Sequence, residues 1–218
     1  MSWESSAEYY RLLNELTAAR DGGLHSADCV LLSVDFAPIE EMQVTGRWDE
    51  AGELLATHAR TLEAAGCDLV LLCTNTMHLV YDAVQAAVRV PVLHLVDATA
   101  LAVLEAGMTT VGLLATGFTM RQDFYRDRMS THGVRVLVPD ADDRALVHRV
   151  IYDELCRGVV RDESRTAYLG VIDRLVDSGA QGVVLGCTEI ELLVSQQHTG
   201  VRVFPTTRLH VEAALEFS

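Results

Sequence analysis

The sequence predicts an α/β protein made of two similar halves, each a parallel β-sheet covered by helices. Two observations lead to this fold class. Half of the 218 residues are apolar and only 6% are aromatic, a balance typical of buried parallel strands rich in Val, Leu and Ala. Short apolar runs also alternate with stretches of helical periodicity, which is the order of elements in βαβ units.

A stretch that occurs twice relates the two halves. One copy starts at Gly66 and the other at Gly179, and an alignment without gaps places Thr74 opposite Cys187. Each copy reads as a buried strand, a turn of small polar residues and a helix, and ligands bind at such junctions in open α/β sheets. We therefore expect pseudo-twofold symmetry between the halves, with both turns facing one active site in the cleft between them.

Hydrophobic periodicity and turn residues predict the elements of the first half in order. Ser2 or Ser5 can cap the first helix, and Gly22 and Gly23 end it. The expected elements are a helix at 7–19, a strand at 29–36, a turn or short helix at 37–43, a helix at 48–65, a strand at 69–73, a helix at 77–87, a strand at 90–94 and a helix at 97–106.

The pattern then restarts in the second half. The expected elements are a strand at 110–116, a helix at 119–132, a strand at 134–138, a loop at 139–143, helices at 144–156 and 161–178, strands at 183–185 and 201–204, and a helix at 206–216. We place the N-terminal half at 1–97, joined by the C-terminal helix at 206–218, and the second half at 98–205.

The repeat also predicts an irregularity in the first half. Asp123-Phe-Tyr resembles Glu8-Tyr-Tyr, and this alignment places Met1 opposite Thr116. The strand expected at 110–115 then has no counterpart, so we predict that the first strand of the N-terminal half is missing. Its sheet would be left with exposed edges. The competing interpretation is that the two halves simply differ here.

Composition excludes several classes of function. A net charge of −14 disfavours nucleic acid and anionic membranes as partners. No apolar run approaches the roughly 18 residues of a membrane span, and no signal peptide opens the chain, so we expect a cytoplasmic protein. The chain contains no lysine, which excludes a pyridoxal phosphate Schiff base and a Walker A site.

The five cysteines lack metal-ligand spacing, which indicates reduced thiols rather than disulfides or a metal site. Cys187 follows an expected strand and precedes an expected helix, whose N-terminus can lower the thiol pKa toward neutral. The same turn can hold a carboxylate on its free N–H groups. The alternative is that Cys187 is a small buried apolar residue. Cys73 points to the opposite strand face from Thr74, and we expect it in the core.

Three histidines, His78, His94 and His210, also lack metal-ligand spacing and are expected as core residues, although His78 could orient the turn at Asn75. Two facing turns with one thiol suit proton transfer at a carbon next to a carboxylate. The N–H dipoles offset the charge that develops on that carboxylate, and a thiolate takes the proton from one face.

At these residues the sequence resembles the aspartate/glutamate racemase family, cofactor-independent enzymes that invert amino-acid centres with two facing acid/base groups. The resemblance is carried by Met1-Ser-Trp-Glu-Ser with Ala7-Glu-Tyr-Tyr, by Cys73-Thr-Asn-Thr-Met-His, and by Leu185-Gly-Cys-Thr-Glu-Ile, with support from 33–43 and 123–125. It covers essentially the whole chain. Relatives carry a strand ending in Gly-Gly before the first of these segments.

The resemblance implies that Cys187 is one acid/base group and that Thr74 takes the place of the other, where relatives commonly carry cysteine. This pairing is similar to that of broad-specificity amino-acid racemases. The resemblance also implies a homodimer, a free amino acid as substrate, and no cofactor or metal. The substrate contacts that it implies are Asn75, Thr76, Thr116, Thr188 and Gln43.

Other functions stay open at this point. A single active cysteine also suits a decarboxylase or a cis–trans isomerase of the same superfamily. A non-catalytic amino-acid-binding protein is a further alternative, because the hydroxyl of Thr74 is a far weaker acid than a thiol.

Overall fold

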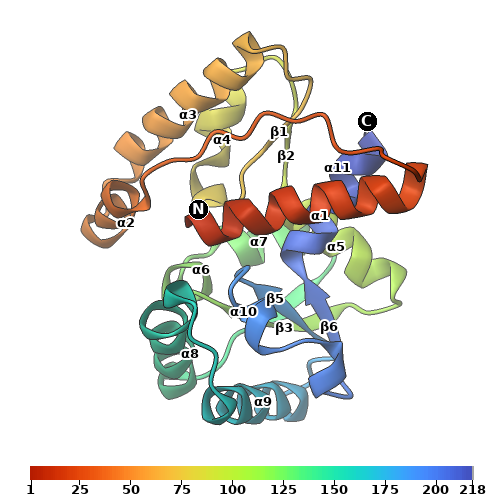
Figure 1. The fold of residues 1–218 in the computed structure, drawn as a ribbon. Helices are drawn as coiled ribbons and strands as arrows, with labels where there is room; N and C mark the ends of the chain where they lie inside the picture. The colour runs from red at the N-terminus through yellow and green to blue at the C-terminus, as the bar shows by residue number, and fades with distance from the viewer. Residues whose placement is uncertain (218) are drawn as a thin grey trace. The chain divides into compact units, whose positions relative to one another are not determined.

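The computed structural model describes residues 1–217, which divide into two units. Unit 1 comprises Met1–His94 and the chain from His210 onward, and unit 2 comprises Leu95–Leu209. Figure 1 follows the chain by colour from the red helix α1 (Trp3–Asp21) to the blue helix α11 (Thr206–Phe217). Each unit combines helices with a parallel sheet, which confirms the α/β fold class.

Unit 1 has a small sheet of two parallel strands, with Val70 paired to Val92 and Leu71 to Leu93. Helix α1 starts as expected, because the Ser2 side chain accepts a hydrogen bond from the N–H of Ser5. The remaining elements are α2 (Phe36–Thr45), α3 (Trp48–Ala64), β1 (Val70–Leu71), the 3₁₀ helix η1 (Thr76–Val80), α4 (Tyr81–Ala86) and β2 (Val92–Leu93).

Two clusters of buried side chains hold unit 1 together. One lies between α3, β1, β2 and α4, and includes Leu55, Val70 and Val84. In the other, Tyr9 and Leu12 of α1 pack against Val211 of α11. The C-terminal helix therefore contributes to the core of unit 1.

The strand expected at 29–36 is wrong. Residues 28–35 form no regular secondary structure, and α2 begins at Phe36; Figure 1 draws this part of the chain as a plain tube between α1 and α2. Val30 is 54% exposed and Leu31 is 49% exposed. A strand needs a neighbour for its backbone N–H and C=O groups, and in the part of the chain that the structure describes no strand pairs with this segment.

Unit 2 has four parallel strands in the order β4-β3-β5-β6. Strands β3 and β5 lie in the middle, with Val111 opposite Gly182 and Ala115 opposite Gly186. The elements are α5 (Leu95–Glu105), β3 (Thr110–Ala115), α6 (Gly117–Arg121), α7 (Phe124–Thr131), β4 (Arg135–Leu137), α8 (Ala141–Asp153), η2 (Leu155–Arg157), α9 (Asp162–Asp177), β5 (Gly182–Gly186), α10 (Ile190–Leu193), η3 (Gln196–His198) and β6 (Arg202–Pro205).

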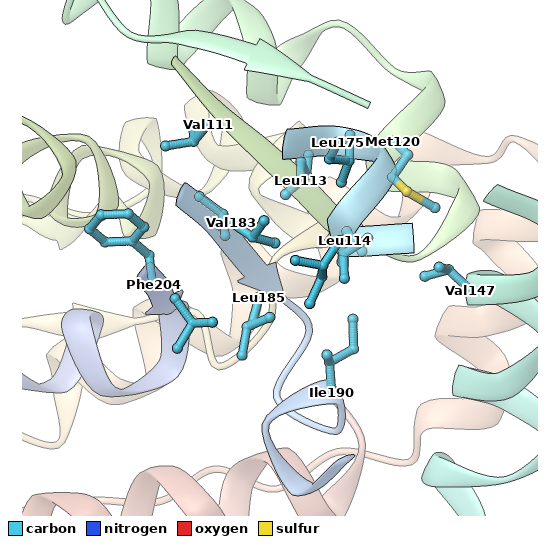
Figure 2. Packing of buried hydrophobic residues seen from close by; sticks show 14 of the residues in the cluster. Val111, Leu113, Leu114, Met120, Val147, Leu175, Val183, Leu185, Ile190 and Phe204 are labelled. Atoms are coloured by element: carbon cyan, nitrogen blue, oxygen red, sulfur yellow. The ribbon is translucent and has the colours of Figure 1, made fainter. Parts of the chain in front are cut away.

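The middle strands of unit 2 are buried on both faces, as a parallel sheet covered by helices requires. Leu113 and Leu114 are adjacent in β3, so they point to opposite faces, and both are completely buried. Figure 2 shows these side chains gathered with Val183 and Leu185 of β5. The resulting core holds the carboxyl ends of β3 and β5 in fixed register.

Two helix predictions in unit 2 need correction. The helix expected at 119–132 is two helices, because Gln122 has extended backbone angles between α6 and α7. Helix α8 begins at Ala141, inside the loop expected at 139–143. Its start is set by Asp140, whose side chain accepts a hydrogen bond from the N–H of Asp143.

Within residues 1–217, no helix is both long and apolar enough to cross a membrane. All five cysteines are free thiols.

Candidate active site

The Cys187 turn lies in unit 2, between β5 and α10. The Cys187 thiol donates a hydrogen bond to the Oε2 atom of Glu189, with 2.8 Å between the sulfur and the oxygen. Glu189 is buried, with 5% of its surface exposed. Burial raises the pKa of Cys187 well above its usual value, and the neighbouring carboxylate raises it further. The resting state of this residue is therefore a protonated thiol.

The expectation that a helix N-terminus lowers the pKa of Cys187 is wrong. Helix α10 contains only four residues and starts at Ile190, so its dipole is small. Desolvation and the Glu189 carboxylate both favour the neutral thiol. At this turn a neutral thiol therefore faces a carboxylate that can accept its proton.

The first two residues of helix α11 are hydrogen-bonded to the Cys187 turn and its strand within unit 2. The Thr207 hydroxyl donates to the Thr188 hydroxyl at 3.0 Å, and the Thr207 N–H donates to Glu191 at 3.1 Å. The Thr206 hydroxyl donates to the carbonyl oxygen of Leu185 at 2.9 Å, two residues before the thiol. Neither Thr206 nor Thr207 stood out in the sequence, although two adjacent threonines at the start of an expected helix were a usable signal.

Thr116 lies beside the Cys187 turn, because Ala115 of β3 pairs with Gly186 of β5. The backbone thus brings the residues after these two strands to the same edge of the sheet. The Thr116 hydroxyl accepts a hydrogen bond from the N–H of Thr119 and caps α6. Thr116 and Thr188 are 8% and 7% exposed, so both residues are buried.

The Thr74 turn in unit 1 follows β1. The N–H of Thr74 donates to the carbonyl oxygen of Leu72 at 2.7 Å, which closes a tight turn. Asn75 and Thr76 are buried, with 5% and 6% of their surfaces exposed. Gln43 reaches this turn from α2, where its side-chain amide donates to the sulfur of Met77 at 3.0 Å. The structure therefore places Gln43 against Met77, the residue that follows Thr76 in the chain.

A histidine cluster supports the Thr74 turn. The Nδ1 atom of His78 is 2.8 Å from the carbonyl oxygen of Thr74, so this ring nitrogen donates and fixes the turn. This is the orienting contact expected for His78. The His78 ring lies 4.7 Å from that of His94 and 5.9 Å from that of His210, between ring centroids.

His210 is the innermost histidine of this cluster. Its Nε2 donates to the carbonyl oxygen of Leu93 at 3.0 Å, so its Nδ1 accepts the hydroxyl proton of Tyr9 at 2.8 Å. Burial lowers the pKa of His210 to about 3, with a smaller contribution from His78. The ring is therefore neutral at physiological pH and acts as a fixed link between α1, α11 and β2.

Cys73 lies one residue before the turn and packs with Tyr9 and Leu12, as a core residue should. Burial raises its pKa to about 11. Among the described residues, no group of three His, Cys, Asp or Glu side chains is arranged to hold a metal ion. The chemically active groups of the two turns are thus one thiol, one carboxyl group and several hydroxyl groups.

The comparison with known protein families decides what kind of protein carries these two turns. The model of the Asp/Glu/Hydantoin racemases matches residues 1–214. The chain belongs to this family. Both turns lie inside the matched region, as do α1 and nearly all of α11.

Solved structures of similar sequence share the whole fold of the chain. A candidate Asp/Glu racemase from Yersinia pestis is 47% identical, with a TM-score of 0.92, and the match covers 99% of this chain and 94% of that one. An aspartate racemase homologue from Pyrococcus horikoshii OT3 is 32% identical, with a TM-score of 0.86, and the match covers 98% and 93%.

A curated relative carries a more specific name. The broad-specificity amino-acid racemase RacX of Bacillus subtilis is 30% identical over 92 residues, which are 42% of this chain and 40% of that protein. The matched part therefore spans less than half of either chain.

Proposed function

We propose that this protein racemises a free amino acid without a cofactor, by proton transfer at the α-carbon. Cys187 and Thr74 are the two acid/base positions. The observation that carries the proposal is the contact between the Cys187 thiol and the Glu189 carboxylate inside a racemase-family fold. A buried structural cysteine has no need of a buried carboxylate as its hydrogen-bond acceptor.

The Cys187–Glu189 pair can serve both directions of the reaction. In one direction the resting thiol donates its proton to the α-carbon. In the other, Glu189 first accepts the thiol proton, and the thiolate then takes the α-proton and becomes a thiol again. The high pKa of Cys187 favours donation, because a thiol that holds its proton at rest is ready as an acid.

The Thr74 position is the weaker acid/base group. A threonine hydroxyl is a poor base at neutral pH, so its proton exchange runs through a water molecule or only slowly. We therefore propose unequal turnover of the two enantiomers. The carbonyl contact from His78 keeps the Thr74 turn rigid, so that the hydroxyl keeps one position during this slower step.

The amide and hydroxyl groups of both turns are proposed to bind the substrate. N–H groups and hydroxyl groups that surround a carboxylate stabilise the charge that develops when the α-proton leaves. We assign this role to Asn75, Thr76, Thr116 and Thr188, with Gln43 in support. Because the chain has no lysine, this stabilisation takes the place of the electron sink that pyridoxal phosphate supplies in other racemases.

The experiment is an incubation of single enantiomers of a panel of amino acids in heavy water, followed by chiral analysis and mass spectrometry. Racemisation with deuterium at the α-carbon is expected for at least one amino acid. Release of carbon dioxide would instead indicate a decarboxylase. Binding by calorimetry without any exchange would indicate a non-catalytic binding protein and would refute the proposal.

The Thr74→Cys variant tests the proposed inequality between the two positions. A second thiol should raise turnover in the slower direction and bring the two directions closer together. Kinetics that stay unchanged in both directions would show that Thr74 is not an acid/base position.

A further inference from the structure

The peptide bond between Thr116 and Gly117 is held by a hydrogen bond on each side. Its carbonyl oxygen, which belongs to Thr116, accepts the N–H of Met120 at 3.0 Å. Its N–H, which belongs to Gly117, donates to the Nδ1 atom of His148 at 3.1 Å. The first bond lies within the helical turn of α6, whereas the second comes from α8 and joins residues 31 positions apart. The His148 side chain therefore fixes the orientation of the peptide plane that follows Thr116.

The absence of a side chain at Gly117 lets the histidine ring come this close. Gly117 is buried. A β-carbon at this position would lie 3.3 Å from the Nδ1 atom of His148 and 3.4 Å from the Nη2 atom of Arg121. Both distances are tight for a carbon atom, so a larger residue would push the ring away from the backbone N–H. Gly117 and His148 are thus fitted to each other.

Two aromatic rings pack around the imidazole ring of His148. The ring of Tyr152, one helical turn further along α8, lies 4.8 Å away between centroids. The ring of Phe118 lies 5.9 Å away and meets the imidazole edge-on, at an angle of 85°. Packing on these sides limits the rotation of the imidazole ring. The Nδ1 atom is therefore kept toward the N–H of Gly117.

The bond to Gly117 depends on the protonation of His148. Because Nδ1 accepts a hydrogen bond, the proton of the neutral ring is on Nε2. The titratable and charged groups around the ring are Arg121 from α6, and Asp153 and Tyr152 from α8. Burial lowers the pKa of His148 and Arg121 lowers it further, whereas Asp153 opposes the shift. A second proton would occupy Nδ1 and face the Gly117 N–H, donor against donor, so the bond would be lost.

We propose that His148 is a positioning residue for the substrate, which holds the Thr116 turn through Gly117 only while its ring is neutral. This inference rests on the proposed function, in which Thr116 contacts the amino acid. Protonation of the ring releases the turn, so the amino acid binds less well in acid. The thiol of Cys187 stays protonated over the same range, because its pKa is far higher. The acid limit of the reaction is thus set by a side chain that acts through a neighbouring peptide bond.

The first test compares the pH profile of kcat/KM for α-proton exchange in the wild type, His148→Asn and His148→Leu. The Asn side chain offers an acceptor oxygen as many bonds from its α-carbon as Nδ1, and it does not titrate. We expect wild-type kcat/KM to fall below pH 6.5, the ordinary value for histidine. His148→Asn should keep near-normal activity at neutral pH and lose this fall. His148→Leu should lower kcat/KM by roughly three- to tenfold at neutral pH, the effect of one hydrogen bond.

His25→Asn, which changes an exposed histidine of unit 1, is the matched control and should keep the wild-type profile. A fall in acid that His148→Asn leaves unchanged would overturn the proposal. So would a His148→Leu variant with wild-type kcat/KM. Rescue of the leucine defect by asparagine separates positioning from a loss of folded protein, because neither variant has an imidazole ring to pack.

A second measurement does not depend on activity. The amide resonance of Gly117 in ¹⁵N-labelled protein should shift from neutral to mildly acidic pH in the wild type and stay in place in His148→Asn. A Gly117 resonance that does not titrate in the wild type would refute the coupling even where racemisation is found. If an amino acid binds without racemisation, the proposed function fails, and the same variants are then compared by the Kd of that amino acid. A Kd that rises in acid in the wild type but not in His148→Asn would still support the positioning role, and equal Kd values would refute it.

Discussion

The two copies of the repeated stretch give different structures. In unit 2, strand β5 has five residues and lies inside a four-stranded sheet. In unit 1, strand β1 has two residues and a single partner strand. Both copies carry an apolar run before a polar turn, so local sequence alone does not explain the difference. The number of neighbouring strands does.

The turns that follow these two strands also differ in their side chains and hydrogen bonds. The Cys187 turn holds a thiol with an acceptor carboxylate, and α11 braces it through Thr206 and Thr207. The Thr74 turn holds a hydroxyl group and is fixed through its backbone by His78. The Cys187 turn is therefore organised by a hydrogen bond that the thiol proton makes, whereas the Thr74 turn is organised by a hydrogen bond that fixes its main chain.

The largest expected effect is a loss of racemase activity, which should be greater for a substitution in the Cys187 turn than for one in the Thr74 turn. Cys187→Ala should lower racemisation by ~10²–10⁴-fold, the usual contribution of one acid/base group. Thr74→Ala should cost less, because the hydroxyl is the weaker group. Both are measured as α-proton exchange in each direction. Cys67→Ala, a thiol in unit 1 outside both turns, serves as the control, and near-normal activity of Cys187→Ala would remove that residue from the mechanism.

A matched pair of leucines compares the two cores. Leu185 and Leu72 occupy equivalent places in the repeat, and they are 1% and 7% exposed. Leu185→Ala should cost about 4 kcal/mol in free energy of unfolding and Leu72→Ala about 2 kcal/mol, within the usual range for buried leucines. The smaller loss follows because Leu72 lines a cavity inside unit 1, between α1, α3 and residues 65–73, where neighbouring side chains can relax. Urea unfolding measures both, and equal losses would show that β1 is packed as well as β5.

Acid should destabilise the protein through His210 in unit 1. Its folded-state pKa is about 3 against an ordinary value of 6.5, so the unfolded chain binds a proton that the folded chain cannot. The contribution of His210 to the free energy of unfolding is then fully present above pH 6.5. It falls as the pH drops toward 3, by at most about 1.4 kcal/mol per pH unit. Replacing His210 with Gln should flatten this slope in urea titrations across the range. An unchanged slope would show that a group other than His210 causes the acid sensitivity.

The smallest expected effect concerns the thiol pKa. Glu189→Gln removes the carboxylate that helps to raise the pKa of Cys187, while burial remains the larger cause. The pKa should fall but stay above that of a free thiol. The pH dependence of alkylation by iodoacetamide reports it, in a background where the other four cysteines are changed to alanine or serine. A pKa that rises in the variant would reverse the role assigned to Glu189.

The sequence predicted the middle strands of unit 2 well because β3 and β5 are apolar and pair with a neighbour on both sides. The strand expected at 110–116 and that at 183–185 both formed, and the Gly66 and Gly179 turns were recognisable from composition. The strand expected at 29–36 failed for the opposite reason. Its residues favour a strand, but strand formation depends on a neighbour that periodicity cannot reveal.

For the site, the sequence identified the two turns but not the electrostatics within them. Strand-end position and small polar residues pointed to Thr74 and Cys187. The direction of the pKa shift of Cys187 depended on the rotamer of Glu189 and on burial, neither of which sequence spacing encodes. The Thr207 contact joins residues nineteen positions apart, and only the folded chain brings them together.

The free thiols have a practical consequence. The chain has no lysine, so its side chains offer thiols and no amines to a labelling reagent. Cys29 is exposed, whereas the other four thiols are only partly exposed. A thiol-directed dye therefore reacts first at Cys29 and reports on unit 1 from outside both turns.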